Sequence, residues 1–300
     1  MSLFVSYISV DNQASNTFVV SINRLKNTTM NKKLLLLFIA AFLASFAFSQ
    51  LPAEKSNQSE VIGLQPGHGV NVLVFTKTLG FYHDSKPNAI KAFYEIAHEN
   101  KWRITFTEDS TFFSETELSK YSVVIFLLTT GDNLLNDGEK LALQQYVESG
   151  GGFVGVHSAT DTEFKWPWYE GLMGARFIGH PPVHEGNLII EDRNHAATRC
   201  FAADTVKWKD EFYSFDRNPR NNSRVKVLVS IDENSYNINE NLWFKDVNIV
   251  MGDHPLIWCQ HIGRGRSFQT ALGHTSELYD NPIFRKHLTG AILWAAGKAE

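Results

Sequence analysis

Histidine and carboxylate side chains, the groups best suited to proton transfer and metal binding, recur where short apolar runs of this sequence end. The chain contains 11 histidines, and imidazole is the side chain whose ordinary pKa lies closest to neutral pH. The residues of interest are His83, Asp84, His157, Asp161, His180, His184, Glu185, Asp210, Glu211, His254 and His274. Any one of these histidines could have a purely structural role. Its position relative to the predicted strands is therefore used to identify the functional candidates.

Two kinds of chemistry fit these residues, and the sequence leaves both open. In the first, a histidine and a carboxylate perform general acid-base catalysis, with the carboxylate orienting the ring. In the second, two or three histidines and a carboxylate hold Zn²⁺ or another divalent metal, which polarises a carbonyl or a bound water. His180 and His184 have ligand-like spacing, but Pro181 and Pro182 break the helix that such a pair would need. The cofactor is therefore unknown, with a divalent metal possible.

The stretch from Gly150 to Asp161 places two of these groups most clearly. A Gly-rich turn precedes the apolar run 153–156, which is too short for a helix and is typical of a buried parallel strand. Within this run Gly155 indicates close approach of another backbone. His157 and Asp161 follow where the strand should end, and open α/β sheets bind ligands outside the carboxyl ends of their strands. We therefore expect His157 and Asp161 at the core of a site.

Asp210 and Glu211 are adjacent within a run, from Thr205 to Phe215, that reads as one strand. Because side chains alternate along a strand, the two carboxylates should point to opposite faces. At most one of them can point into a shared pocket unless a bulge re-aims the other.

The elements that must position these groups alternate between strand and helix in the first half of the chain. The predicted strands are 72–75, 102–107, 121–128 and 153–156, and the predicted helices are 86–100 and 137–149. This rhythm predicts a flavodoxin-like α/β fold, a parallel sheet flanked by helices. The second half is strand-rich, with runs at 183–191, 205–215, 225–231, 255–261 and 266–272 before a closing helix at 283–296. It predicts a strand-rich insertion into the same domain.

The amino-terminal segment has the pattern of a secretory signal. Residues 30–49 combine a basic start, an apolar run and small residues before a cleavage point at Gln50. The apolar run is shorter than the roughly 20 residues that span a bilayer. We expect residues 1–29 to be an over-extended start, 50–69 a flexible leader, and the mature protein to be periplasmic or secreted without a stable membrane anchor.

Charge and cysteine content exclude some partners. The formal net charge is −4, and no basic stripe is visible, which argues against a nucleic-acid partner. The two cysteines, Cys200 and Cys259, could pair in an oxidising compartment, but sequence cannot test their distance. The oligomeric state is not predicted.

Several short motifs together resemble the ThuA-like (trehalose-utilisation) family over residues 70–298. They are Gly80-Phe81-Tyr82-His83-Asp84-Ser85, the central 150–161 stretch, Gly174-Ala175-Arg176-Phe177 with His180-Pro181, His195-Ala196-Ala197-Thr198, Asp210-Glu211-Phe212-Tyr213, His254-Pro255-Leu256-Ile257-Trp258, and Gly263-Arg264-Gly265-Arg266 through Gly273-His274. Where this family usually has His-Pro before Thr, the chain has His195-Ala196. The resemblance implies a class I glutamine amidotransferase-like fold.

Amidotransferases of that fold carry a nucleophilic Cys on a tight strand-to-helix elbow. Here His157 occupies the corresponding position, and both cysteines lie far along the chain. Glutamine hydrolysis by a thiolate is therefore excluded, although the fold is retained.

Aromatic residues and the resemblance both favour a carbohydrate substrate. Trp166, Trp168 and Tyr169 follow the central strand, and flat apolar rings suit the C–H faces of a sugar. The resemblance implies trehalose-like disaccharides or keto-sugar derivatives. Arg266 could bind a sugar hydroxyl or carboxylate, or pair with an acidic neighbour.

The prediction is an exported carbohydrate-processing enzyme, a hydrolase, lyase or isomerase. Its expected catalytic residues are His157, Asp161, His180, Asp210 and Glu211. Its expected substrate-binding residues are His83, Trp166, Tyr169, Tyr213, Arg266 and His274. A non-catalytic sugar-binding protein and a metal-dependent hydrolase of another small substrate are the alternatives.

Overall fold

The computed structural model describes residues 69–240 and 243–300. The predicted upstream extension (1–29), the signal peptide (30–49) and nearly all of the leader (50–69) lie outside these residues. Within the described ranges, none of the helices is long and apolar enough to cross a membrane.

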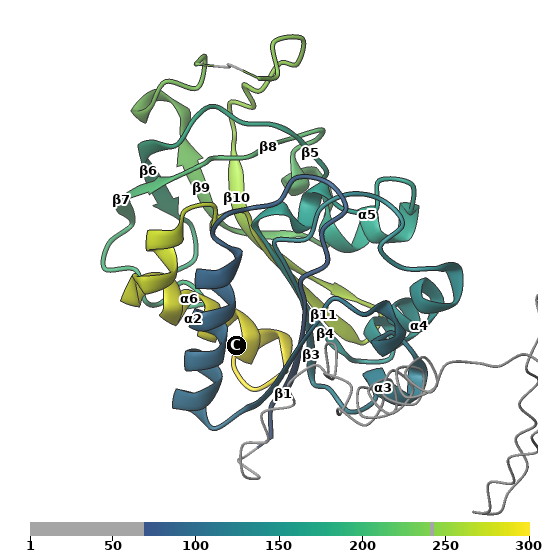
Figure 1. The fold of residues 1–300 in the computed structure, drawn as a ribbon. Coiled ribbons are helices and arrows are strands. Elements are labelled where there is room, and N and C mark those ends of the chain that lie inside the picture. The colour runs from purple at the N-terminus through teal and green to yellow at the C-terminus, as the bar shows by residue number, and fades with distance from the viewer. Residues whose placement is uncertain (1–68, 241–242) are drawn as a thin grey trace, which may run out of the picture. The chain divides into compact units, whose positions relative to one another are not determined.

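The main sheet of the described residues has nine strands in the order β2-β1-β3-β4-β11-β10-β9-β6-β7 (Figure 1). Its parallel part comprises β1 (Asn71–Phe75), β2 (Arg103–Thr107), β3 (Val123–Leu127), β4 (Gly152–Val156) and β11 (Gly265–Thr270). Antiparallel pairing adds β10 (Pro255–Ile262), β9 (Lys226–Asp232), β6 (His184–Ile190) and β7 (Thr205–Asp210). Two short strands, β5 (Phe177–Gly179) and β8 (Ser214–Phe215), pair separately. The predicted α/β class is confirmed, and the strand-rich second half continues the main sheet.

Helices cover both faces of this sheet (Figure 1). One face carries α2 (Lys86–Asn100) and α6 (Pro282–Ala295), and the other carries α3 (Glu115–Leu118), α4 (Asp137–Glu148) and α5 (Pro167–Met173). Successive side chains of a strand point to opposite faces of the sheet, so each strand contributes residues to both packed layers. Val74 and Val154 belong to the core beneath α2 and α6, whereas Phe126 and Phe153 pack with residues of α4 and α5.

Strand direction brings distant loops to one edge of the sheet. β1, β4 and β11 run parallel, and the reversals through β10, β9 and β6 make β7 point the same way. The residues that follow these four strands therefore emerge together, where ligands of such sheets bind. Short 3₁₀ turns complete the fold: Ser110–Phe112, His157–Asp161, Pro219–Asn221, Glu233–Ser235 and Ser276–Asp280.

The predicted close approach at Gly155 is present in β4. A Cβ added there would lie 2.1 Å from Oε1 of Gln269 and 2.6 Å from Cε of Met173. The neighbours are two side chains, not a backbone. A larger residue at this position would require the ends of the Gln269 and Met173 side chains to move.

Candidate functional site

Three histidines and one glutamate converge at the carboxyl edge of the sheet. One ligand atom from each of His83, His157, His274 and Glu211, here called the His–Glu cluster, lies within 4.8 Å of every other. His274 Nδ1 lies 3.0 Å from Glu211 Oε2 and 3.3 Å from His157 Nε2. His157 Nε2 is 3.6 Å from Glu211 Oε2. His180 stands beside the cluster, with Nδ1 3.0 Å from Glu211 Oε1. The structure thus gathers five predicted site residues at one place.

His157 directly follows β4 in a strained backbone conformation. Its φ of 51° lies in the left-handed region, which non-glycine residues rarely adopt and which clusters at functional sites. The ring is fully buried, and its Nδ1 donates to the carbonyl of Ala271 at 2.8 Å. This bond leaves the lone pair of a neutral ring on Nε2, which faces Glu211 and His274. The elbow of the fold therefore presents an imidazole nitrogen.

Glu211 carries the negative charge of the cluster. Burial alone would raise the pKa of its carboxyl, but the His157 and His274 rings beside it outweigh burial and lower that pKa to about 2. For His274, burial lowers the pKa, yet the bond to Glu211 outweighs it and the pKa is raised. At pH values below this raised pKa, His274 carries a proton that it donates to the Glu211 carboxylate.

Asp210 supports the cluster without joining it. The predicted strand 205–215 is interrupted: β7 ends at Asp210 and β8 begins at Ser214. The fully buried Asp210 carboxylate accepts the backbone N–H groups of Gly273 at 2.7 Å and His274 at 3.1 Å. Burial raises its pKa. As predicted, only one carboxylate of the adjacent pair points into the cluster. Asp210 was expected to be catalytic, but it instead holds the backbone of the His274 loop in position.

His83 closes the cluster from the loop after β1. Its Nε2 lies 3.3 Å from the hydroxyl of Tyr213, and its buried Nδ1 has no hydrogen-bond partner among the described residues. Burial, followed by the neighbouring His157 and His274, lowers the pKa of His83 to about 2. The ring is therefore neutral at physiological pH and keeps a nitrogen lone pair available.

A pocket of about 650 Å³ opens onto the cluster. Its lining residues are Phe81, His83, Asp161, Phe177, His180, Glu211, Tyr213, Trp243, Phe244 and His274. None of these described lining residues is Lys or Arg. Asp161, four residues beyond His157, lines this pocket outside the cluster. Burial, with a smaller contribution from Asp132, raises the pKa of Asp161 to about 7, which suits a group that exchanges protons near neutral pH.

The aromatic wall of the pocket differs from the predicted one. Tyr213 lines it as expected, but Trp166 and Tyr169 do not. Tyr169 is buried with its hydroxyl on the carbonyl of Ala159, and Trp166 stacks on it at 5.7 Å in the core beneath α4 and α5. The expected substrate contacts of Trp166 and Tyr169 are therefore corrected to packing.

The residues that form the wall instead come from two other segments. Phe81 and Trp243 are 64% and 60% exposed at the pocket. Trp243 and Phe244 pack 5.4 Å and 5.0 Å from the His180 ring. The motifs that contain Phe81 and Phe177 were visible in the sequence, whereas no motif included Phe244.

Arg266 also lies away from the pocket. It belongs to the amino-terminal part of β11, whereas His274 follows the carboxyl end of that strand. Its guanidinium donates to the carbonyl of Trp294 at 3.0 Å and pairs with Glu300 at 2.9 Å. Of the two roles considered for Arg266, sugar binding and pairing with an acidic residue, the structure shows the ion pair.

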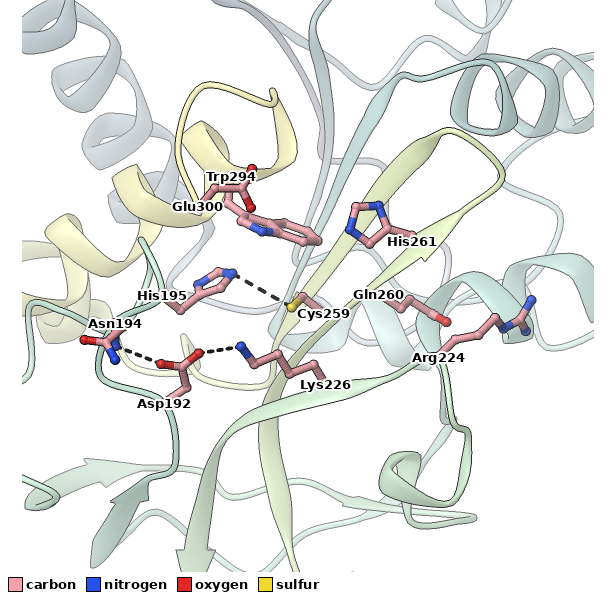
Figure 2. A pocket seen from close by; sticks show the side chains of 10 residues that line it. All are labelled: Asp192, Asn194, His195, Arg224, Lys226, Cys259, Gln260, His261, Trp294 and Glu300. Atoms are coloured by element: carbon pink, nitrogen blue, oxygen red, sulfur yellow. Dashed lines mark hydrogen bonds and ion pairs between the residues drawn. The ribbon is translucent and has the colours of Figure 1, made fainter.

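A second pocket, of about 390 Å³, lies beside β10 and contains a cysteine–histidine pair (Figure 2). Cys259 Sγ is 3.8 Å from His195 Nε2, while His195 Nδ1 accepts the backbone N–H of Ala197. A neutral His195 ring therefore carries its proton on Nε2 and cannot take one from the thiol. Burial raises the pKa of Cys259 to about 12. Both cysteines are free, and this pair is no activated nucleophile.

Comparisons with known proteins agree with the fold and the motifs. A family model described as ThuA, trehalose utilisation, matches residues 71–295. A ThuA-like protein from Bacteroides uniformis is 25% identical with a TM-score of 0.65, covering 77% of this chain and 93% of its own. A ThuA-like protein from Parabacteroides merdae is 21% identical with a TM-score of 0.59, covering 77% and 91%. No curated protein matches the chain. This protein belongs to the ThuA (trehalose utilisation) family.

Proposed function

We propose that this protein processes a neutral sugar, a trehalose-like disaccharide or a keto-sugar derivative, and that the His–Glu cluster holds a divalent metal, with Zn²⁺ as the first choice. The observation that carries the proposal is the approach of the four ligand atoms to within 4.8 Å. Membership of the trehalose-utilisation family supports the sugar class. The absence of Lys and Arg from the described pocket lining favours an uncharged substrate.

The donor set fits a divalent metal. Imidazole nitrogens with one carboxylate oxygen are ligands that Zn²⁺ accepts. His157 has its outer nitrogen bonded to a backbone carbonyl, the arrangement that orients metal-ligating histidines. His83 is neutral with a buried nitrogen lacking a hydrogen-bond partner among the described residues, and Glu211 is ionised. A bound metal would act as a Lewis acid toward a carbonyl or a water.

The remaining pocket residues would bind the sugar and move protons. Asp161 lies in the pocket outside the cluster, and its pKa of about 7 allows it both to donate and to accept a proton. The rings of Phe81, Trp243 and Tyr213 offer faces for sugar C–H groups. His180 holds the second oxygen of Glu211 and thereby fixes the carboxylate.

The proposal is tested by assaying metal-stripped and Zn²⁺-reconstituted protein on trehalose, related disaccharides and their keto derivatives. The expected result is metal-dependent turnover of at least one neutral sugar. Binding of these sugars without turnover in either form would favour the non-catalytic alternative. Turnover of only a non-sugar substrate would favour the alternative hydrolase.

Zn²⁺ affinity should rise with pH up to the raised pKa of His274 and level off above it. A metal must displace the proton on His274, whose pKa is raised by Glu211, so protonation competes with metal binding below that pKa. Each proton released strengthens the affinity by about tenfold per pH unit. Calorimetric titration with Zn²⁺ at three pH values, repeated in buffers of different ionisation enthalpy, measures both the affinity and the protons released. An affinity independent of pH would contradict this picture of the site.

A further inference from the structure

The segment that carries Glu211 into the pocket has no regular secondary structure of its own. It lies between the end of β7 at Asp210 and the start of β8 at Ser214. Asp210 fixes its first end through the backbone of Gly273 and His274. At its second end, Ser214 pairs with Gly179 in the short two-stranded sheet of β5 and β8. The Tyr213 carbonyl, which precedes this pairing, is held by a side chain instead.

A buried imidazole–carboxylate pair occupies that second end. His254, which immediately precedes β10, is 1% exposed, and its Nε2 lies 2.8 Å from the carbonyl oxygen of Tyr213. Its Nδ1 lies 2.8 Å from Oε1 of Glu233, whose side chain is 10% exposed. The two nitrogens of the His254 ring therefore each face one acceptor oxygen, so the ring links the Glu233 carboxylate to the Tyr213 carbonyl.

Glu233 holds more than the histidine. Its carboxylate also accepts the backbone N–H groups of Met251 at 2.7 Å and Gly252 at 2.9 Å. In the loop that contains Met251 and Gly252, the carbonyl of Ile249 accepts a hydrogen bond from the Ser214 hydroxyl at 2.6 Å. Upstream, this loop contributes Phe244 to the pocket wall. Glu233 therefore joins the loop that walls the pocket to the segment that carries Glu211.

We propose that Glu233 and His254 are positioning residues that fix the 211–214 segment, and with it the Glu211 carboxylate, in the geometry of the His–Glu cluster. Neither side chain belongs to that cluster or lines the pocket. They act through the Tyr213 carbonyl and the backbone that connects it to Glu211. Groups that hydrogen-bond a metal ligand directly change metal affinity by about 10–100-fold when removed. His254 acts one step further out, through the backbone, so we expect an effect at the lower end of that range. The metal part of this inference rests on the proposed function.

The test compares Zn²⁺ affinity by calorimetry, with thermal unfolding measured in parallel. His254→Leu should weaken Zn²⁺ binding about tenfold or more, whereas His254→Gln, which can still donate to the Tyr213 carbonyl, should recover part of the loss. His287→Leu is the matched control. His287 is fully buried, and its Nδ1 also bonds a backbone carbonyl, that of Ala197 at 2.8 Å, but it packs against Phe284 on α6. This control should lower stability without changing Zn²⁺ affinity.

If His254→Leu does not fold, Glu233→Gln provides the second variant. Its single amide oxygen can keep some of the hydrogen bonds that the carboxylate makes to Met251, Gly252 and His254, so this variant is a milder change. A crystal structure of the metal-free variant supplies a readout that does not depend on metal. The expected structure has the Glu211 carboxylate displaced from His274. An unchanged Glu211 with unchanged Zn²⁺ affinity would overturn the inference. Failure of the unmodified protein to bind Zn²⁺, with Glu211 displaced in the variant, would overturn the metal proposal alone.

Discussion

Glu211→Gln is expected to abolish tight Zn²⁺ binding and to remove metal-dependent turnover. Glu211 is the only carboxylate among the four ligand groups of the cluster, and it also bonds His180 and His274. An amide keeps the shape but loses the charge that the metal and the protonated His274 both need. Because even outer partners of a metal site cost about 10–100-fold, loss of this ligand should cost about 100-fold or more in affinity.

Calorimetric titration with Zn²⁺ measures the loss of affinity. An assay with the neutral sugar that the unmodified protein turns over measures the loss of activity. Glu163→Gln is the matched control, since the Glu163 carboxylate is equally buried but pairs with Lys140 at 2.7 Å and accepts the backbone N–H of Leu135. The control should lose stability and keep its Zn²⁺ affinity. Full Zn²⁺ affinity in Glu211→Gln would show that the cluster is a hydrogen-bonding network and not a metal site.

Asp161→Asn is expected to lower turnover by about 100-fold or more, the scale of a general acid or base, while leaving Zn²⁺ affinity unchanged. Burial raises the pKa of Asp161 to about 7, so it loses its proton as the pH rises through neutrality. If it acts as the acid, activity falls above that pH; if it acts as the base, activity falls below it. In either case Asp161→Asn should remove the change in activity that occurs near the pKa of Asp161 in the pH–rate profile.

A double variant extends the test of Asp161. His157→Ala removes a cluster ligand, and Asp161→Asn removes the proton-transfer group of the same pocket. Groups that act as one unit are non-additive, so the double variant should lose little beyond the worse single one. Retained turnover and an unchanged pH profile in Asp161→Asn would exclude Asp161 from the chemistry.

The sequence was sufficient for the parts of the fold that depend on local pattern. The continuous apolar run at 153–156 predicted β4, and its end predicted the position of His157. The left-handed backbone of His157 was not visible, because its ring and carbonyl make their contacts with Ala271 and Gln269, more than a hundred residues away. Arg266 was expected to bind substrate, but it lies in the opposite part of β11 from His274, so the direction of that strand keeps it away from the pocket.

Two aspects of the site depended on contacts that no local pattern records. The strand predicted over 205–215 is interrupted where Asp210 caps the backbone of Gly273 and His274, and this interruption lets Glu211 face the cluster. Trp166 and Tyr169 lie close to the central strand in sequence, which suggested a sugar platform. Helix α5 instead carries Tyr169 into the core beneath α4 and α5, so the pocket wall comes from loops distant in sequence.

A crystal of the protein soaked in Zn²⁺ and measured at the zinc absorption edge would show whether the His–Glu cluster holds a metal. We expect an anomalous peak among His83, His157, His274 and Glu211, with nitrogens at about 2.0–2.1 Å and the carboxylate oxygen at about 2.0–2.2 Å from the zinc. The same soak of Glu211→Gln should show no peak there. A cluster without a peak in the unmodified protein, or a peak beside Cys259 and His195 instead, would contradict the account.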